Sequence, residues 1–193
     1  MKSKKVIWIG GILVLLLVYF ISTRNGLVGK QEKVRQQWAE VQSTYQRRLD
    51  LIPNLVNTVK GVSEFESSTL EQIAAARAKA LSGQAGASIS GESYSAQSAA
   101  QDTLAAAANR VIILIEKYPV LKGTAAYSGL QTQLEGTERR IKVARNDFNE
   151  AVATYNKSVR SFPTNLVAKL LGFKAAEGFT AAKGAEKTVE IKF

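Results

Sequence analysis

The 193 residues include 26 lysines and arginines against 16 aspartates and glutamates, a net charge of +10, and neither histidine nor cysteine. Without those two residue types, serine–histidine catalysis, thiol nucleophiles, the usual zinc sites and the Glu-x-x-His pattern of di-iron bundles are excluded. The sequence also has no glycine-rich phosphate loop, so we predict a non-enzymatic protein without catalytic, cofactor-binding or metal-binding residues.

An apolar segment lies near the N-terminus. Residues 6–23 carry no charge, with lysines before them and Arg24 after them. A helix of that length rises about 27 Å, close to the roughly 30 Å of a bilayer core. Residues 19–23 offer no small-x-small cleavage site, and the segment exceeds the ~7–15 apolar residues usual in a signal peptide. We interpret residues 1–26 as a short tail and a retained transmembrane anchor, which contacts the lipid bilayer through residues 6–23. A cleaved signal peptide is the alternative.

Basic residues flank the anchor on both sides and favour one orientation only weakly. They are Lys2, Lys4 and Lys5 before it and Arg24, Lys30, Lys33 and Arg35 after it. Because positive charge close to a membrane span favours the cytoplasmic side, we expect the N-terminus in the cytoplasm and the body on the opposite side.

After the anchor, apolar residues recur at steps of three and four, the spacing of one helix face. This first stripe consists of Val34, Trp38, Val41, Tyr45, Leu49, Ile52, Leu55 (or Val56) and Val59. Pro53 lies within it. Because proline removes one helical hydrogen bond, we expect a kink over residues 49–53, since the apolar phase continues beyond them.

A second, longer stripe occupies the C-terminal part of the chain. It consists of Tyr127, Leu130, Leu134, Thr137, Ile141, Ala144, Phe148, Ala151, Tyr155, Val159 and Phe162. It predicts one helix over residues 124–162 that ends at Pro163.

Between the two stripes the sequence predicts a helix over residues 68–81 and another over residues 94–117. Residues 82–93, rich in glycine and serine, predict a flexible loop. The apolar phase leaves open whether the first helix continues through residues 61–68. The final residues, 188–193, alternate polar and apolar side chains, as a short strand or an extended arm does.

Together these segments predict an all-α protein. An N-terminal transmembrane helix precedes an antiparallel long-helix bundle of the four-helix type over residues 27–163. Residues 164–193 are expected to form a short amphipathic helix and an extended tail, which docks on its own bundle or on a neighbouring copy. The short helix suits a lipid headgroup surface or a neighbouring bundle, or else packs on its own bundle. Its candidate contact residues are Leu166, Leu170, Leu171, Phe173, Lys169 and Lys174.

Two blocks, residues 45–61 and 130–145, place charges beside the apolar stripes. Partly buried charges need partners. We therefore predict either a hydrogen-bonded network across a helix pair or a surface for a partner protein. The candidate residues are Arg47, Arg48, Asp50, Asn54, Glu135, Glu138 and Arg139.

These blocks resemble the LemA family of bacterial membrane proteins. The motifs that carry the resemblance are Trp38 with Val41, QRRLDLIPNLVNTVKG, Ala75-Ala-Arg77, Tyr118-Pro119, LQTQLEGTERRIKVAR, Phe148-Asn149, Tyr155-Asn156, Phe162-Pro163 and Gly172-Phe173. The chain has Phe65-Glu66 where the family often has His-Glu, and Phe148-Asn149 where Tyr-Asn is usual. The resemblance implies a single-pass protein of the bacterial inner (cytoplasmic) membrane with a helical body, here expected on the periplasmic side. It implies no settled biochemical activity.

We therefore expect a membrane-anchored scaffold or adaptor that self-associates as a homo-oligomer and organises the bacterial cell envelope membrane. The alternative is an accessory subunit that binds a membrane protease, a transporter or another envelope membrane protein. A carboxylate enzyme would need an acid–base pair such as Asp50 with Glu138, but acidic pairs on helices are far more often solvated or salt-bridged. Nucleic-acid binding is not expected, because the aromatic residues lie on apolar stripes and predict core packing.

Overall fold

The computed structural model describes residues 2–60, 67–85 and 91–179, and within these ranges every regular element is a helix. The helices are α1 (Lys2–Lys60), α2 (Ser67–Ala85), α3 (Gly91–Ile115), α4 (Pro119–Lys122), α5 (Ala125–Arg160) and α6 (Thr164–Leu170). The expected all-α class is confirmed. The question of continuity through residues 61–66 and the strand-like pattern at 188–193 both lie outside the described residues.

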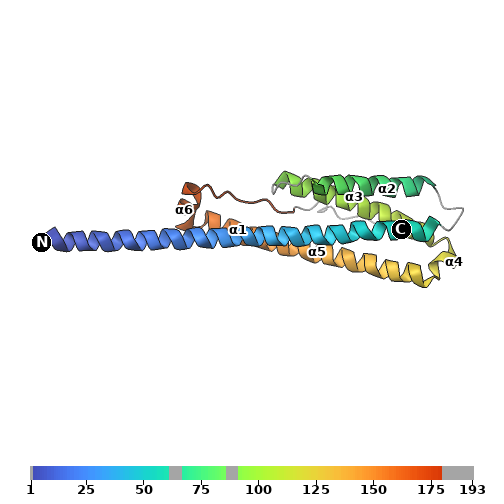
Figure 1. The fold of residues 1–193 in the computed structure, drawn as a ribbon, viewed down its shortest axis with the longest axis horizontal. Coiled ribbons are helices and arrows are strands. Elements are labelled where there is room, and N and C mark those ends of the chain that lie inside the picture. Colours follow the sequence, from blue (N-terminus) through green and yellow to red (C-terminus); the bar gives the residue numbers. More distant parts are fainter. Residues whose placement is uncertain (1, 61–66, 86–90, 180–193) are drawn as a thin grey trace, which may run out of the picture.

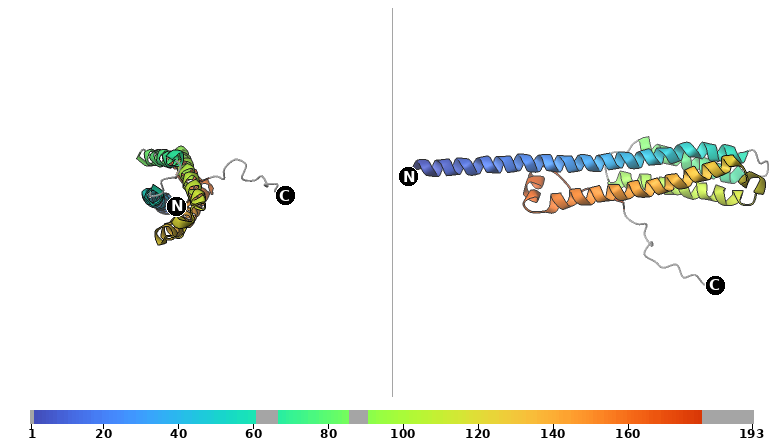
Figure 2. Two further views of the ribbon diagram at one scale, coloured as in Figure 1. Left: turned by 90° about the vertical axis from the view of Figure 1, so that its right-hand side faces the viewer. Right: turned by 90° about the horizontal axis from the view of Figure 1, so that it is seen from below.

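The four long helices run alternately up and down. In Figure 1, α1 and α3 run away from the N-terminal end, and α2 and α5 return towards it. Helix α1 packs along α5, and α2 packs along α3. The end-on view in Figure 2 shows these helices side by side, and the right-hand view shows α1 extending far beyond the others. This arrangement confirms the predicted antiparallel bundle.

The core is built from the two predicted stripes. All residues of the first stripe are buried, with Leu55 rather than Val56 inside. The second stripe is buried from Tyr127 to Tyr155. The half of the bundle near α4 is mainly aliphatic, with Tyr127 among its buried residues, whereas the half nearer the N-terminus contains Trp38, Tyr94 and Phe148. Since burying one large apolar side chain stabilises a fold by about 1.5–3 kcal/mol, these stripes supply most of the driving force.

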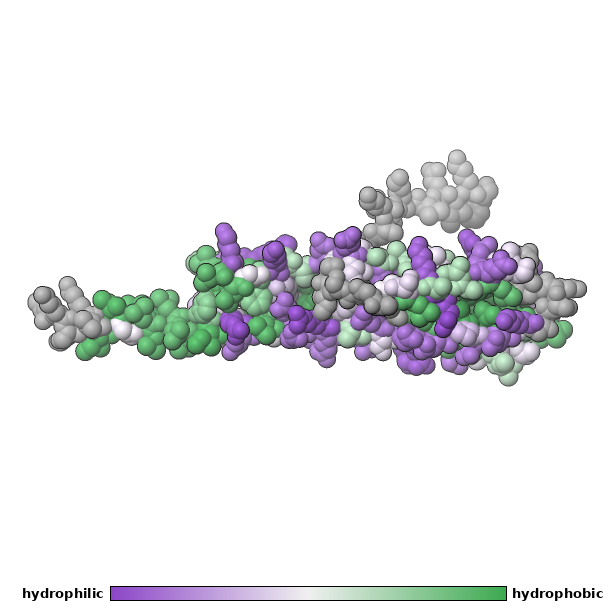
Figure 3. Space-filling model, turned by 45° about the horizontal axis from the view of Figure 1, so that its top comes forward, coloured by the Kyte–Doolittle hydropathy of each residue, from purple (hydrophilic) through white to green (hydrophobic). Residues whose placement is uncertain are grey.

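The N-terminal part of α1 leaves the bundle. Large apolar side chains from Ile7 to Val18 are each more than half exposed, and Leu27 is the first fully buried one from residue 7 onward. Figure 3 shows this extension as an apolar surface that continues into a body rich in polar side chains. Within the described residues, α1 is the one helix long and apolar enough to cross a membrane.

Two predicted boundaries are wrong. Helix α5 ends at Arg160, and Phe162 is 80% exposed instead of continuing the stripe. A residue before proline avoids helical geometry, so the chain already turns at Ser161, which has extended backbone angles. The predicted loop 82–93 is also too long, because α2 reaches Ala85 and α3 begins at Gly91. Each glycine or serine lowers the stability of a helix by about 1 kcal/mol or less relative to alanine. The packing of α2 against α3 outweighs this cost.

Helix α1 passes through Pro53 without a break. Proline has no backbone N–H, so the carbonyl of Leu49, four residues earlier, loses its usual helical partner. Arg77 of α2 takes that place, because its Nε donates a hydrogen bond to the Leu49 carbonyl oxygen at 3.1 Å. The proline therefore creates an acceptor that joins α1 to α2.

Candidate functional site: a polar network and a docked C-terminal segment

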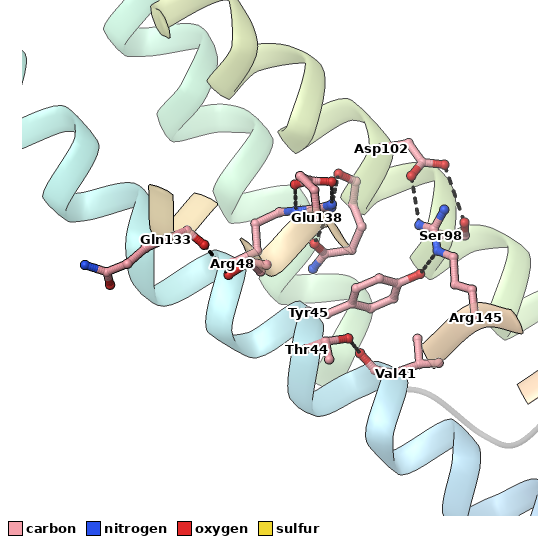
Figure 4. A network of polar contacts seen from close by, with 11 residues as sticks. Val41, Thr44, Tyr45, Arg48, Ser98, Asp102, Gln133, Glu138 and Arg145 are labelled. Atoms are coloured by element: carbon pink, nitrogen blue, oxygen red, sulfur yellow. Dashed lines mark hydrogen bonds and ion pairs between the residues drawn. The ribbon is translucent and has the colours of Figure 1, made fainter. Parts of the chain in front are cut away.

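A buried arginine joins three helices. Arg48 of α1 is 2% exposed, and its Nε and Nη2 donate to the two carboxylate oxygens of Glu138 on α5 at 2.8 and 2.5 Å. Its Nη1 donates to the backbone oxygen and the side-chain oxygen of Gln101 on α3 at 2.9 and 3.2 Å. Figure 4 shows the pairing of Arg48 with Glu138. The paired geometry holds α1, α3 and α5 in one register, because a guanidinium binds a carboxylate in a fixed plane.

A second polar contact lies about one turn earlier on α1. Arg145 of α5 donates from Nε to the Tyr45 hydroxyl at 2.9 Å and from Nη2 to Asp102 of α3 at 2.8 Å. Ser98 donates to the same aspartate (Figure 4). Burial raises the pKa of Tyr45 above its ordinary value, and the neighbouring Arg145 acts in the opposite direction. The tyrosine is therefore neutral at physiological pH and serves as a hydrogen-bond acceptor.

The other predicted network residues lie on the surface. Asp50 accepts a hydrogen bond from Gln46, and Glu135 accepts one from Gln131, in each case within one helix. Arg47, Asn54 and Arg139 are also exposed. The structure thus brings Arg48 and Glu138 together and leaves these five side chains available to a partner protein. Among the described residues, no group of three or more acidic, histidine or cysteine side chains is placed to hold a metal ion.

The chain after α6 turns back along the bundle (Figure 1), and α5 holds it through two asparagines. Asn156 donates to the backbone oxygen of Ala176 and accepts from its N–H, both at 2.8 Å. Asn149 binds Phe179 in the same way, at 3.1 and 2.8 Å. We call Asn149 and Asn156 the asparagine ladder and residues 173–179 the docked segment. The described part of the predicted tail therefore contacts its own bundle.

The docked segment completes an aromatic cluster. The ring of Phe179 lies 5.8 Å from Trp38 and 5.3 Å from Phe148, measured between ring centroids. The guanidinium of Arg145 lies 5.4 Å from the same ring. Each such aromatic pair adds about 0.5–1.5 kcal/mol beyond the area it buries. The segment is thereby linked to the polar network through Arg145.

Sequence reasoning did not identify the ladder as a site. In the sequence, Phe148-Asn149 and Tyr155-Asn156 stand out only as motifs of the resemblance. The available signal was the seven-residue spacing of two aromatic–asparagine pairs, which places both asparagines on one helix face. The Tyr155 hydroxyl adds a further bond, donated to the backbone oxygen of Lys174 at 2.9 Å.

Removal of the ladder is expected to release the docked segment. In an Asn149→Ala/Asn156→Ala variant, four hydrogen bonds to the segment's backbone are lost. We expect trypsin to cleave after the exposed Lys174 at least about tenfold faster, because each of the four net hydrogen bonds contributes about 0.5–1.5 kcal/mol and a tenfold change needs only about 1.4 kcal/mol. The measurement is limited proteolysis followed by mass spectrometry. The matched control is Asn146→Ala, an exposed asparagine on the same helix, which should leave the rate unchanged.

Short helix α6 lies at the end of the bundle nearest the apolar extension (Figure 1) and contacts both α1 and α5. Val167 and Ala168 face inward and are buried. Phe162, Leu166, Leu170 and Leu171 are exposed, and we call these four residues the apolar foot. Of the other residues that the sequence singled out, Lys169 and Lys174 are exposed, and Phe173 is half-buried against the bundle.

Comparisons with known proteins add to this description. A sequence model of the LemA family matches residues 37–193. Magnetosome protein MamQ of Magnetospirillum gryphiswaldense is 27% identical over 188 residues, which cover 86% of this chain and 69% of that protein. Magnetosome proteins MamQ 1 and MamQ 2 of Paramagnetospirillum magneticum are 37% identical over 73 residues, or 38% of this chain. That match spans only 27% of each of those two relatives. Protein LemA of Metamycoplasma hominis is 24% identical, with coverage of 89% and 76%.

Proposed function

Because the chain belongs to the LemA family, we propose that it is a membrane-anchored, non-enzymatic scaffold that self-associates and organises the bacterial envelope membrane. Three relatives are named magnetosome proteins, which favours a structural role. We further propose that residues 6–23 span the inner membrane once and that the bundle lies on the periplasmic side.

One observation supports this proposal above the others: two apolar surfaces face solvent at the same end of the bundle. The first is the exposed extension of α1. The second is the apolar foot, where Phe162, Leu166 and Leu170 are 80%, 61% and 76% exposed. A soluble bundle gains nothing from exposing such side chains next to each other, whereas a bilayer removes both from water.

The spacing along α1 supports a position of the foot at headgroup depth. The uncharged segment ends at Thr23, and Leu27, the first buried residue, follows four positions later. Four helical residues rise about 6 Å, so the base of the bundle begins just above the hydrocarbon. Lys169, exposed beside the foot, can meet anionic headgroups there. The anchor and the foot together would fix the angle of the bundle to the membrane.

The opposite end of the bundle is held far from the bilayer. Helix α5 has 36 residues, and a helix of that length spans about 54 Å. At that far end, Val120 of α4 is 89% exposed. A rod with this geometry presents its sides to neighbouring copies over most of its length, which is what a scaffold requires.

The foot is expected to enter the lipid headgroup region of a reconstituted membrane. The chain has no cysteine, so Leu170→Cys can carry a single fluorophore. In vesicles with nitroxide-labelled headgroups, we expect the label at position 170 to be quenched several-fold more than in vesicles without nitroxide. A label on Val120→Cys, about 54 Å away along α5, is the control and should show no quenching.

Equal quenching at the two positions would contradict an upright bundle. Absence of quenching at position 170 would show that the foot does not contact lipid, and the proposed second membrane contact would be abandoned. A second variant, Leu166→Asp with Leu170→Cys, tests the apolar cause. It should lose most of the quenching, because an aspartate in place of a leucine opposes burial in the interface.

A further inference from the structure

We propose that the asparagine ladder is a binding site for an extended polypeptide backbone, and that it accepts the docked segment of a second copy of this chain in exchange for its own. This inference rests on the proposed self-association and names the contact through which copies would join.

The ladder binds backbone groups rather than side chains. Each asparagine amide donates to the carbonyl and accepts from the N–H of one residue, as a neighbouring strand would. The distance between the two asparagines matches the distance between the two residues that they bind. Seven helical residues rise about 10.5 Å, and the three extended residues from Ala176 to Phe179 span about 10 Å. Helix α5 can therefore hold any chain segment that lies extended along it at this repeat.

Side-chain size restricts which segment fits. Phe173, Ala176 and Phe179 face the bundle, whereas Lys174, Ala175 and Glu177 are exposed. A Cβ at Gly178 would lie 2.7 Å from the Asn149 Oδ1, so a larger residue there would push away the amide oxygen that accepts from the Phe179 N–H. The site thus favours an aromatic anchor directly after a glycine, with a small residue two positions before that glycine. A second copy of the chain carries this sequence and would make identical contacts.

The docked segment is joined and packed in a way that permits exchange. Gly172, which connects it to α6, has a φ of +77°, so the polypeptide reverses direction at a glycine. The segment also leaves a cavity of about 290 Å³ between itself and Gln31, Arg35 and Tyr94. On the side of this cavity, opening the segment breaks fewer contacts than opening the close-packed core would.

The membrane brings the docked segment of one copy close to the asparagine ladder of another. Anchored copies stand at one height, so the docked segment of one copy lies level with the asparagine ladder of its neighbour. Confinement to a surface raises the effective concentration of each segment at the next ladder. Exchange of an identical element between copies is a low-cost route to oligomers, because no new interface has to form.

A disulfide experiment on the full chain in membranes tests the exchange. A Cβ at Gly91 would lie 2.7 Å from the Glu177 Cβ, about 1 Å closer than a disulfide prefers, so the two positions can be bridged once the segment moves outward by about that distance. One tagged chain carries Gly91→Cys with Glu177→Ala, and a differently tagged chain carries Glu177→Cys. After co-expression and mild oxidation, we expect a cross-linked dimer that carries both tags.

Two controls separate exchange from chance collision. In the first control, the tagged chain carries Asp147→Cys in place of Gly91→Cys. Asp147 lies on α5 at about the same height as Asn149 but about 200° around the helix from it. The mixed cross-link should exceed this control by at least about tenfold, given the effective concentrations typical of linked sites. In the second control, Asn149→Ala/Asn156→Ala in the Gly91→Cys chain should remove the excess. An unchanged cross-link in that variant would overturn the role of the ladder.

The outcome can be separated from the scaffold proposal itself. Energy transfer between Val120→Cys copies that carry donor and acceptor dyes reports self-association by any route. Energy transfer above that of randomly placed copies, without the mixed cross-link, overturns the exchange and leaves the scaffold proposal standing. If vesicles show neither energy transfer above random placement nor the mixed cross-link, both the exchange and the scaffold proposal are overturned. If a chain that carries both Gly91→Cys and Glu177→Cys forms only the intramolecular disulfide, that result also contradicts exchange.

Discussion

Replacing Glu138 by alanine is expected to destabilise the bundle by about 2–3 kcal/mol, whereas Arg48→Met should cost less than about 1 kcal/mol. The asymmetry follows from burial. The Arg48 side chain is 2% exposed and that of Glu138 is 47% exposed. Loss of the carboxylate leaves a positive charge inside the bundle, but loss of the guanidinium leaves a carboxylate that water can reach. Urea unfolding of the full chain in detergent, followed by far-ultraviolet circular dichroism, measures both values.

The double variant sharpens this test. Arg48→Met combined with Glu138→Ala should recover most of the stability lost in Glu138→Ala alone, because the unpaired charge is gone. Glu135→Ala is the matched control. This exposed carboxylate lies one turn earlier on α5 and should stay within about 0.5 kcal/mol of the unmodified chain. Equal losses in the two single variants would show that the buried charge is not the source of the effect.

Arg77→Met is expected to cost about 1.5–2 kcal/mol, more than an exposed arginine would. Its Nε donates a hydrogen bond to the carbonyl oxygen of Leu49, which has no helical donor because Pro53 lacks a backbone N–H. In a Pro53→Ala background the new backbone N–H can bind that carbonyl directly. The cost of Arg77→Met should then fall below about 1 kcal/mol. The same unfolding measurement, carried out on all four chains of the cycle, gives the coupling.

Lys79→Met serves as the control for this cycle, since Lys79 is exposed on the same helix two positions later. It should have the same small effect with proline or alanine at position 53. If Arg77→Met costs the same in both backgrounds, the arginine acts through other contacts and the proline is unrelated to it.

The sequence alone determined, apart from the helix ends, where the long helices lie and which of their faces are buried. The spacing of apolar residues at steps of three and four is a local property of the chain. The stripes from Val34 to Val59 and from Tyr127 to Tyr155 could therefore be placed without coordinates. The length and apolarity of residues 6–23 indicated a membrane span for the same reason. Helix ends were harder: Phe162 was misplaced because one turn at Ser161 outweighed the periodicity.

Only the tertiary structure decided which polar groups meet. Arg48 and Glu138 are 90 residues apart, and their neighbours Arg47 and Glu135 look equally suitable in sequence, yet these lie on the surface. The bond from Arg77 to a carbonyl 28 residues earlier and the docking of residues 173–179 on Asn149 and Asn156 are of the same kind. Such pairings depend on the rotation and register of packed helices, which the apolar period of one helix does not specify.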